Sequence, residues 1–245
     1  MIRKTLKRSS TLNGVKRAIW SSAKRGQKVE EEEDNMFNKK VYPNILLNIV
    51  SVHGVYSSGK DLVTLCDQVS GISELSEEKV KISIINYGTL LLTLERIPFV
   101  RNLIAMIIAN RLAACSYKYP NAKTMVIAHS FGTWATCEAL KKWGEEFRLN
   151  CLILFGSVVS RKFKFDNFLD TEVHNIIGKR DFVVLSSALW GTGWSGFFGF
   201  KKDSKVINNN LKQYNTSKGH SGYKESYSIL CDITKNFVSK NISHE

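Results

Sequence analysis

Apolar residues in this chain are concentrated in short runs rich in Val, Ile and Leu, with longer mixed segments between them. The run 45–52 is apolar at most positions, which is typical of a strand buried on both faces of a sheet. We predict a strand at each such run, the last being the least clear: 45–52, 80–87, 124–128, 151–159, 173–177 and 205–211.

The segments between these runs have the apolar spacing of helices. They cover residues 61–69, 101–117, 131–147 and, after the last strand, 221–238. Alternating strands and helices indicate a parallel sheet, because parallel neighbours must be joined by crossover connections. We therefore predict an α/β fold, a three-layer α/β/α sandwich whose mostly parallel sheet has about six strands.

The first 41 residues differ in composition from the rest of the chain. They contain 11 basic and 5 acidic side chains, the acidic ones in one run at 30–34, and few large apolar residues. Such a segment buries too little apolar surface to form a core. We expect 1–41 to be a flexible basic N-terminal segment, with at most a short helix at 13–23, and 42–245 to form one domain.

The formal net charge of +13 favours association with phosphate groups, on nucleic acid or on an anionic membrane. The chain has no zinc-finger spacing and no ribonucleoprotein motif, so we predict no specific nucleic-acid partner. In the N-terminal segment, basic residues flank the short apolar group Val15, Ala18, Ile19 and Trp20. We expect this segment to tether the protein to an anionic membrane; the alternative is a tail that only aids solubility.

The five cysteines are scattered and form no Cys-x-x-Cys pair, which favours a reducing compartment such as the cytoplasm, with the protein free or peripheral at a membrane. The most apolar stretch, 90–114, is interrupted by charged residues, and the basic N-terminus lacks the apolar run of a secretory signal. We therefore expect neither a transmembrane helix nor a secretory signal.

The sequence Ala128-His129-Ser130-Phe131-Gly132 lies where a predicted strand leads into a predicted helix. A serine at such a sharp turn needs small residues two positions before and after it, because larger side chains would collide with the neighbouring strand and helix. The amide of Phe131 then lies at a helix N-terminus, where it can stabilise an oxyanion.

This pattern resembles the nucleophile elbow of the α/β-hydrolase superfamily, Gly-x-Ser-x-Gly, with alanine in place of the first glycine. The resemblance covers residues 44–240 and lacks the first two strands of the full superfamily sheet. It implies a trimmed sheet in which the second strand of this chain lies at one edge, the first strand beside it, and the third to the sixth follow in order.

Val52-His53-Gly54-Val55 ends the first predicted strand. In the superfamily, a His-Gly pair here precedes the residue whose backbone N–H completes the oxyanion hole, which implies Val55. The alternative is a buried, hydrogen-bonded His53 beside a glycine that only makes a turn.

The acid and the base of the site are implied by two further loops. Gly178-Lys179-Arg180-Asp181 follows a predicted strand and resembles the superfamily's Gly-x-x-Asp turn, whereas Asp166 and Asp170 come before that strand. Gly219-His220-Ser221 lies ahead of the last predicted helix, and the other histidines lie in strands, beside the serine or at the chain end. A surface salt bridge of Asp181 and an exposed His220 are the alternatives.

The order Ser130, Asp181, His220 is the one found in α/β-hydrolases. The resemblance therefore implies a serine hydrolase of the esterase or lipase type, acting on a small or lipid ester or acyl substrate with no metal and no organic cofactor. A binding or interaction module on the same fold is the alternative. The glycine- and aromatic-rich segment 186–200 either lines the acyl site or closes the core.

Overall fold

The central sheet of the computed structural model has six strands, all parallel, in the order β2-β1-β3-β4-β5-β6. The strands are β1 (Leu47–Val52), β2 (Val80–Ile85), β3 (Lys123–His129), β4 (Cys151–Phe155), β5 (Glu172–Gly178) and β6 (Leu211–Thr216). The predicted sandwich, its strand number and the predicted strand order are confirmed. The structure describes residues 41–54, 60–87, 97–165, 168, 170–187, 192–201, 211–217, 219–220 and 226–242.

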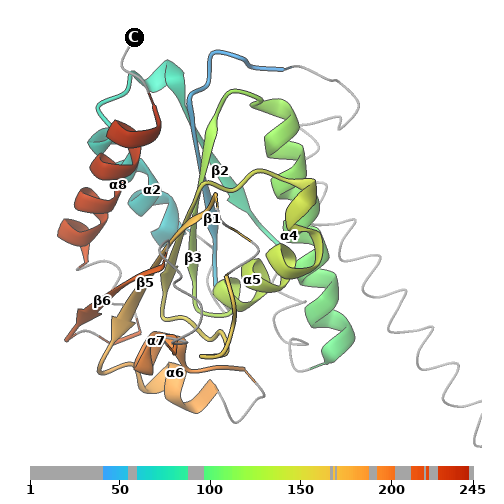
Figure 1. Ribbon diagram of the computed structural model, residues 1–245, viewed down its shortest axis with the longest axis vertical. Helices are drawn as coiled ribbons and strands as arrows, with labels where there is room; N and C mark the ends of the chain where they lie inside the picture. Colours follow the sequence, from blue (N-terminus) through green and yellow to red (C-terminus); the bar gives the residue numbers. More distant parts are fainter. Residues whose placement is uncertain are drawn as a thin grey trace, which may run out of the picture.

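Helices cover both faces of the sheet, as Figure 1 shows. The long helices are α2 (Lys60–Ile72), α4 (Pro98–Lys118), α5 (Phe131–Trp143) and α8 (Tyr227–Asn241). The short ones are η1 (Glu77–Lys79), η2 (Gly144–Glu146), α6 (Phe182–Ser187) and α7 (Ser195–Phe198). Helices α2 and α8 lie together on one face and α4 and α5 on the other, while α6 and α7 lie beyond the carboxyl ends of the strands.

The core has one layer on each face of the sheet because alternate residues of a strand point to opposite faces. Leu47 and Ile49 of β1 belong to the layer under α2 and α8, and Val50 and Val52 to the layer under α4 and α5. All six residues of β1 are buried, as the apolar run predicts. The buried sheet therefore fixes the positions of the carboxyl ends of β1, β3, β4 and β5 relative to one another.

Among the described helices, α4 alone is long and apolar enough to cross a membrane by length and composition. Its fully buried residues Val100, Ile104 and Ile108 lie in the core layer that it shares with α5. Helix α4 thus packs in the core through one face, and 33% of its apolar window is buried.

The end of β4 differs from the sequence prediction, and residues 205–210 of the last predicted strand lie outside the described residues. Strand β6 follows them from Leu211, and its sequence is mostly polar because it is an edge strand. Strand β4 stops at Phe155 because Gly156 has a φ of +52°, outside the β region. Helices α6 and α7 were not predicted. The N-terminal segment 1–40, including the helix expected at 13–23, lies outside the described residues.

Candidate active site

Ser130 lies at the turn between β3 and α5 with a φ of +54° and a ψ of −127°. Non-glycine residues rarely adopt a positive φ, and holding one costs on the order of 1–3 kcal/mol. The surrounding hydrogen bonds hold this conformation. The Ser130 N–H donates to the Phe155 carbonyl at 2.9 Å, and Thr133 donates to the Ser130 carbonyl through its N–H at 2.9 Å and its hydroxyl at 2.6 Å.

The small residues around Ser130 are required by close backbone contacts. A Cβ atom on Gly132 would lie 2.5 Å from the His53 carbonyl oxygen and 2.6 Å from that of Val52. A Cβ atom on Gly54 would lie 2.6 Å from the Cβ of Ser130, and Ala128 is fully buried. The end of β1 and the turn at Ser130 therefore fit together without room for one methyl group.

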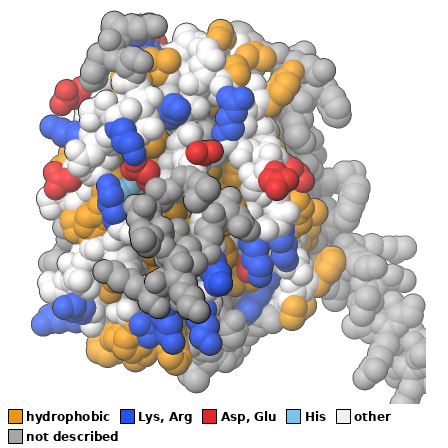
Figure 2. Space-filling model, viewed as in Figure 1, with side chains coloured by type: hydrophobic (Ala, Val, Ile, Leu, Met, Phe, Trp, Pro, Cys, Tyr) orange, Lys and Arg blue, Asp and Glu red, His pale blue; other side chains and the backbone are white. Residues whose placement is uncertain are grey.

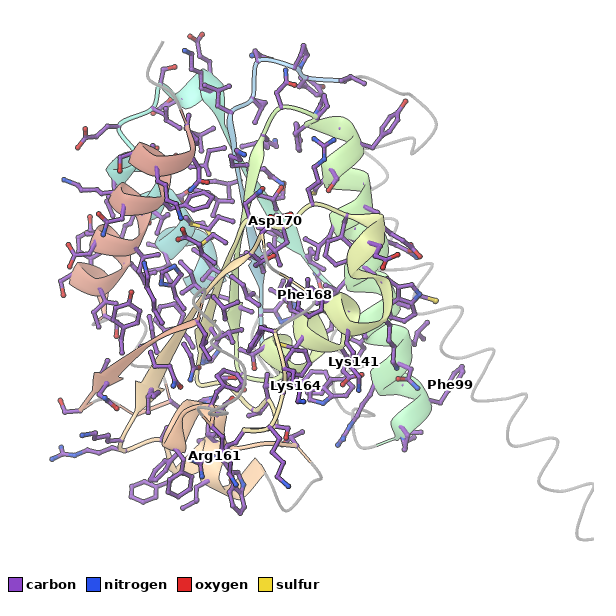
Figure 3. All side chains as sticks on the ribbon, viewed as in Figure 1. Phe99, Lys141, Arg161, Lys164, Phe168 and Asp170 are labelled. Atoms are coloured by element: carbon purple, nitrogen blue, oxygen red, sulfur yellow. The ribbon has the colours of Figure 1, made fainter. Side chains whose placement is uncertain are left out.

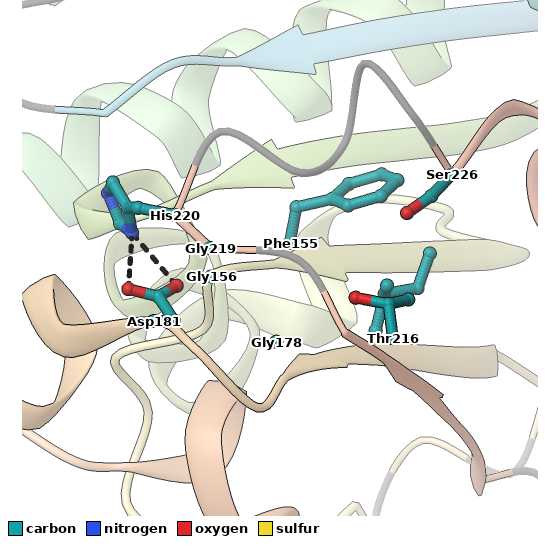
Figure 4. A pocket seen from close by; sticks show the side chains of 9 residues that line it. Phe155, Gly156, Gly178, Asp181, Thr216, Gly219, His220 and Ser226 are labelled. Carbon is teal, nitrogen blue, oxygen red and sulfur yellow. Dashed lines mark hydrogen bonds and ion pairs between the residues drawn. The ribbon is translucent and has the colours of Figure 1, made fainter.

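The structure brings Ser130, His220 and Asp181 into one hydrogen-bonded chain. His220 Nε2 lies 3.0 Å from Ser130 Oγ, and His220 Nδ1 lies 3.0 Å from both carboxylate oxygens of Asp181 (Figure 4). Asp181 is 1% exposed, and its Oδ1 also accepts the Val184 N–H at 2.9 Å. Because the carboxylate accepts the Nδ1 proton, the lone pair of Nε2 faces the serine hydroxyl.

Gly156, which the sequence analysis missed, provides the space for the Asp181–His220 pair. A Cβ atom there would lie 3.0 Å from His220 Nδ1 and 3.2 Å from Asp181 Oδ2. A glycine inside the apolar run 151–159 was the available signal. A small pocket beside the pair, seen in Figure 4, does not have Ser130 in its lining, so we do not assign it to the acyl group of a substrate. It is lined by Phe155, Gly156, Ile176, Gly178, Asp181, Thr216, Gly219, His220 and Ser226.

His129 contacts the loop that carries His220. Its Nε2–H donates to the His220 backbone carbonyl at 3.1 Å, and the two ring centroids are 4.7 Å apart. Burial lowers the pKa of His129 to about 4, with the neighbouring His220 adding to the effect. A neutral His129 therefore holds this loop without placing a second positive charge beside His220.

The turn that follows β1 is only partly described. His53 is buried, its ring stacks on that of Tyr87 at a centroid distance of 4.5 Å, and its Nδ1 lies 2.9 Å from the Gly54 carbonyl oxygen. Tyr87 in turn donates its hydroxyl proton to the His53 carbonyl. Val55 lies outside the described residues, whereas Phe131 is the first residue of α5, whose initial N–H groups have no partner within the helix. The oxyanion roles of both amides stay predictions.

Other candidate groups lie away from Ser130 or are unsuited to its chemistry. Asp170 is exposed at the amino end of β5, far from α6 and α7 in Figure 3, and Asp166 lies outside the described residues. Cys137 and Cys151 are fully buried, and this burial raises the pKa of both thiols well above their ordinary value. A thiol in that state is a poor nucleophile.

The described residues of the aromatic segment 186–200 are partly in the core and partly exposed, and the acyl-site role stays a prediction. Phe200 is 4% exposed and meets Phe165 edge to face in the core, whereas Trp194 and Phe198 are 42% and 49% exposed. Phe200 therefore closes the core and Trp194 and Phe198 point outward, while residues 188–191 lie outside the described part of the chain.

Acid should destabilise the fold through His129. Its neutral form is favoured in the folded protein, where the pKa is about 4, against 6.5 as the ordinary value. As pH falls from 6.5 towards 4, the unfolded chain binds a proton that the folded chain does not. The free energy of unfolding should therefore drop by on the order of 3 kcal/mol from this residue. Burial lowers the pKa of His174 to about 4 as well, which adds to the loss.

Urea unfolding at several pH values measures this dependence. A His129→Gln variant keeps an N–H donor for the His220 carbonyl but does not titrate, so its unfolding free energy should fall less over the same pH range. Equal slopes for the variant and the unmodified protein would show that His129 is not buried in its neutral form.

This sheet, with a serine at the β3–α5 turn and an acid and a histidine after β5 and β6, has the α/β-hydrolase fold. The sequence matches no protein-family model and no curated protein. Among solved structures, Aspergillus fumigatus lipase B is similar over 79% of this chain and 52% of its own, with a TM-score of 0.52 and 11% identity.

Two further solved structures have lower TM-scores. The Pyrococcus furiosus esterase Pf2001 has a TM-score of 0.49 and 14% identity over 82% of this chain and 86% of its own. Trichoderma reesei cutinase, in complex with a phosphonate inhibitor, has a TM-score of 0.46 and 14% identity over 99% of each chain. At such identities the similarity describes the fold alone.

Proposed function

We propose that this protein is a serine hydrolase that cleaves a carboxylic ester through an acyl-enzyme on Ser130. The observation that carries the proposal is the hydrogen-bonded chain from Ser130 Oγ through His220 to the buried Asp181, with both contacts of His220 at 3.0 Å. The strained turn at the serine supports the proposal. The glycines that leave room for the acid and the base support it as well. No sequence relative contributes to this assignment.

In acylation, His220 Nε2 takes the proton of Ser130 as Oγ attacks the ester carbonyl carbon. Asp181 accepts the Nδ1–H of His220 and stabilises the imidazolium that forms. The negative oxygen of the tetrahedral intermediate is stabilised by the amide of Phe131 at the start of α5 and by that of Val55, the second donor that the superfamily resemblance implies. The intermediate collapses with cleavage of the ester C–O bond, and His220 returns its proton to the leaving alkoxide.

In deacylation, a water molecule replaces the departed alcohol. His220 removes a proton from this water while its oxygen attacks the acyl carbonyl, and a second tetrahedral intermediate forms at the same amides. Cleavage of the bond to Ser130 Oγ releases the carboxylic acid, and His220 reprotonates the serine. One ester and one water are consumed, and one acid and one alcohol are formed.

A fluorophosphonate probe tests the proposal, because it phosphonylates only an activated serine. We expect one adduct per folded chain, located on Ser130 by peptide mass spectrometry, and no adduct after heat denaturation. A series of p-nitrophenyl esters from acetate to palmitate then measures which acyl length is preferred. A folded protein that neither reacts with the probe nor cleaves any of these esters would instead be a binding module on this fold.

A further inference from the structure

Five exposed apolar side chains gather on the two short helices beside the candidate active site. Phe182, Val183 and Leu185 of α6 are 70%, 52% and 37% exposed, and Trp194 and Phe198 next to and in α7 are 42% and 49% exposed. We call these five residues the α6–α7 face. Isolated exposed apolar residues are normal on a protein surface, but a group of this size marks a site of interaction.

The α7 part of this face is held rigidly by buried backbone contacts. Gly193 N–H donates to the Val158 carbonyl and Gly196 N–H to the Ser157 carbonyl, both at 2.7 Å. A Cβ atom on Gly196 would lie 2.2 Å from the Ser157 amide nitrogen, so the backbones are in direct contact. Asn175 also donates its side-chain amide to the carbonyl of the buried Ser195 at 2.8 Å. The rings of Trp194 and Phe198 point outward from a fixed support.

The charged side chains around the α6–α7 face are almost all basic. Figure 2 shows hydrophobic atoms at the lower edge of the molecule, over α6 and α7, with Lys and Arg atoms on both sides. Segments 156–165, 178–187 and 192–201 contain one acid, Asp181, which is buried and bonded to His220. Their basic residues are Arg161, Lys162, Lys164, Lys179, Arg180 and Lys201.

None of these six basic residues pairs with a carboxylate in the described part of the chain. Arg161 lies over the Phe198 ring at 5.3 Å and donates to the Gly199 carbonyl, so one cation is fixed at the edge of the face (Figure 3). Lys162, Lys164, Lys179, Arg180 and Lys201 are exposed.

We propose that the α6–α7 face binds an anionic lipid surface, with Phe182, Trp194 and Phe198 inserted at the interface and the lysines and arginines on lipid phosphates. Aromatic and aliphatic residues surrounded by Lys and Arg are the composition of interfacial membrane-binding elements. Basic side chains near an anionic leaflet are attracted to its negatively charged lipid headgroups. A protein partner would need an acidic surface that matches the shape of this face. An anionic membrane needs no such match, because its negative charge is the same however the protein is rotated about the membrane normal.

Membrane binding at this face would bring the lipid surface to the candidate active site. Phe182 directly follows Asp181 in the chain, and α7 packs on the Gly156–Ser157 turn that gives His220 its space. Ester groups at a lipid interface would then lie close to Ser130. This last step rests on the proposed hydrolase function, but the lipid binding itself does not.

Vesicle co-sedimentation of the full-length chain tests the apolar contribution. We expect binding to phosphatidylcholine vesicles that contain about 30% phosphatidylserine, weakening with added salt, and little binding to phosphatidylcholine alone. Trp194→Ser and Phe198→Ser should each weaken binding by about tenfold. Tyr117→Ser, which removes a ring that is 57% exposed at the far end of α4, should leave binding unchanged.

A pair of charge reversals tests the basic residues. Lys162→Glu with Lys164→Glu should weaken binding by at least about tenfold. Lys79→Glu with Lys81→Glu makes the same change in total charge at the amino end of β2 and should weaken it far less. If both pairs weaken binding equally, or if the aromatic variants bind like the unmodified chain, the face is not the binding site.

The N-terminal segment is the competing lipid-binding element and is tested in the full chain by reversing Arg3, Lys4, Lys7 and Arg8 to Glu. The proposal is overturned if this variant loses all binding while the α6–α7 variants keep it. It is also overturned if the unmodified chain binds no vesicle at low salt. Repeating the measurements on Ser130→Ala keeps binding separate from hydrolysis, since an inactive protein should bind equally well.

Discussion

Ester hydrolysis should fall by about 10⁵-fold when Ser130 is replaced by alanine, because the acyl group then has no oxygen to which it can be transferred. The steady-state rate with a soluble p-nitrophenyl ester measures this loss. His220 Nε2, 3.0 Å from Ser130 Oγ in the unmodified protein, would have no hydroxyl to deprotonate. The remaining activity should come from binding and from the oxyanion amides alone.

A Ser130→Gly variant provides the matched control for folding. Glycine adopts a positive φ without strain, so this variant should be as stable as the unmodified protein or more stable, while being equally inactive. If this variant is inactive but as stable as the unmodified protein, the loss of ester hydrolysis is due to the missing hydroxyl and not to unfolding. Ser130→Ala protein that hydrolyses esters at the unmodified rate would refute the role of this residue.

Replacing Asp181 by asparagine should lower kcat by about 10⁴-fold while leaving the fold intact. The carboxylate accepts the Nδ1 proton of His220 through oxygens 3.0 Å away, and it is isosteric with a carboxamide. Asparagine can place its NH₂ group towards Nδ1, which favours the tautomer that carries its proton on Nε2. That tautomer cannot deprotonate Ser130.

Asp170→Asn is the matched control for this substitution, because it removes one carboxylate of the same type at an exposed position before β5. It should change kcat by less than about twofold, since surface substitutions away from a site have small effects. Equal losses for the two variants, or none for Asp181→Asn, would contradict the assigned triad. Thermal melting of both proteins separates unfolding from lost chemistry.

Much of the fold could be predicted because its signals are local. The buried run that becomes β1 is apolar on both faces, and strands that alternate with helices must pair in parallel. The turn at Ser130 was recognisable because the small residues it needs lie within five positions of the chain. Asp181 and His220 were implied by the superfamily resemblance of the loops that carry them, and the two side chains are hydrogen-bonded in the structure.

What the sequence did not reveal depends on contacts between distant segments. Gly156 is needed because His220, from a loop far along the chain, approaches its Cα. Thr133 bonds both the Ser130 carbonyl and the Val158 N–H, and neither bond has a sequence signature. Most of β6 was not predicted because an edge strand needs few apolar residues. Helices α6 and α7 are too short to show a helical period.

The contact between Gly54 and Ser130, and that between Gly132 and the carbonyls of Val52 and His53, limit how this protein can be redesigned. Saturation mutagenesis at Gly54 and Gly132 should return glycine almost exclusively among active clones, because alanine at position 54 would overlap Ser130 and alanine at position 132 would overlap the end of β1. Libraries aimed at new acyl selectivity would gain nothing at these two positions. Substitutions are better made at exposed residues such as Trp194 and Phe198, whose side chains have solvent beside them.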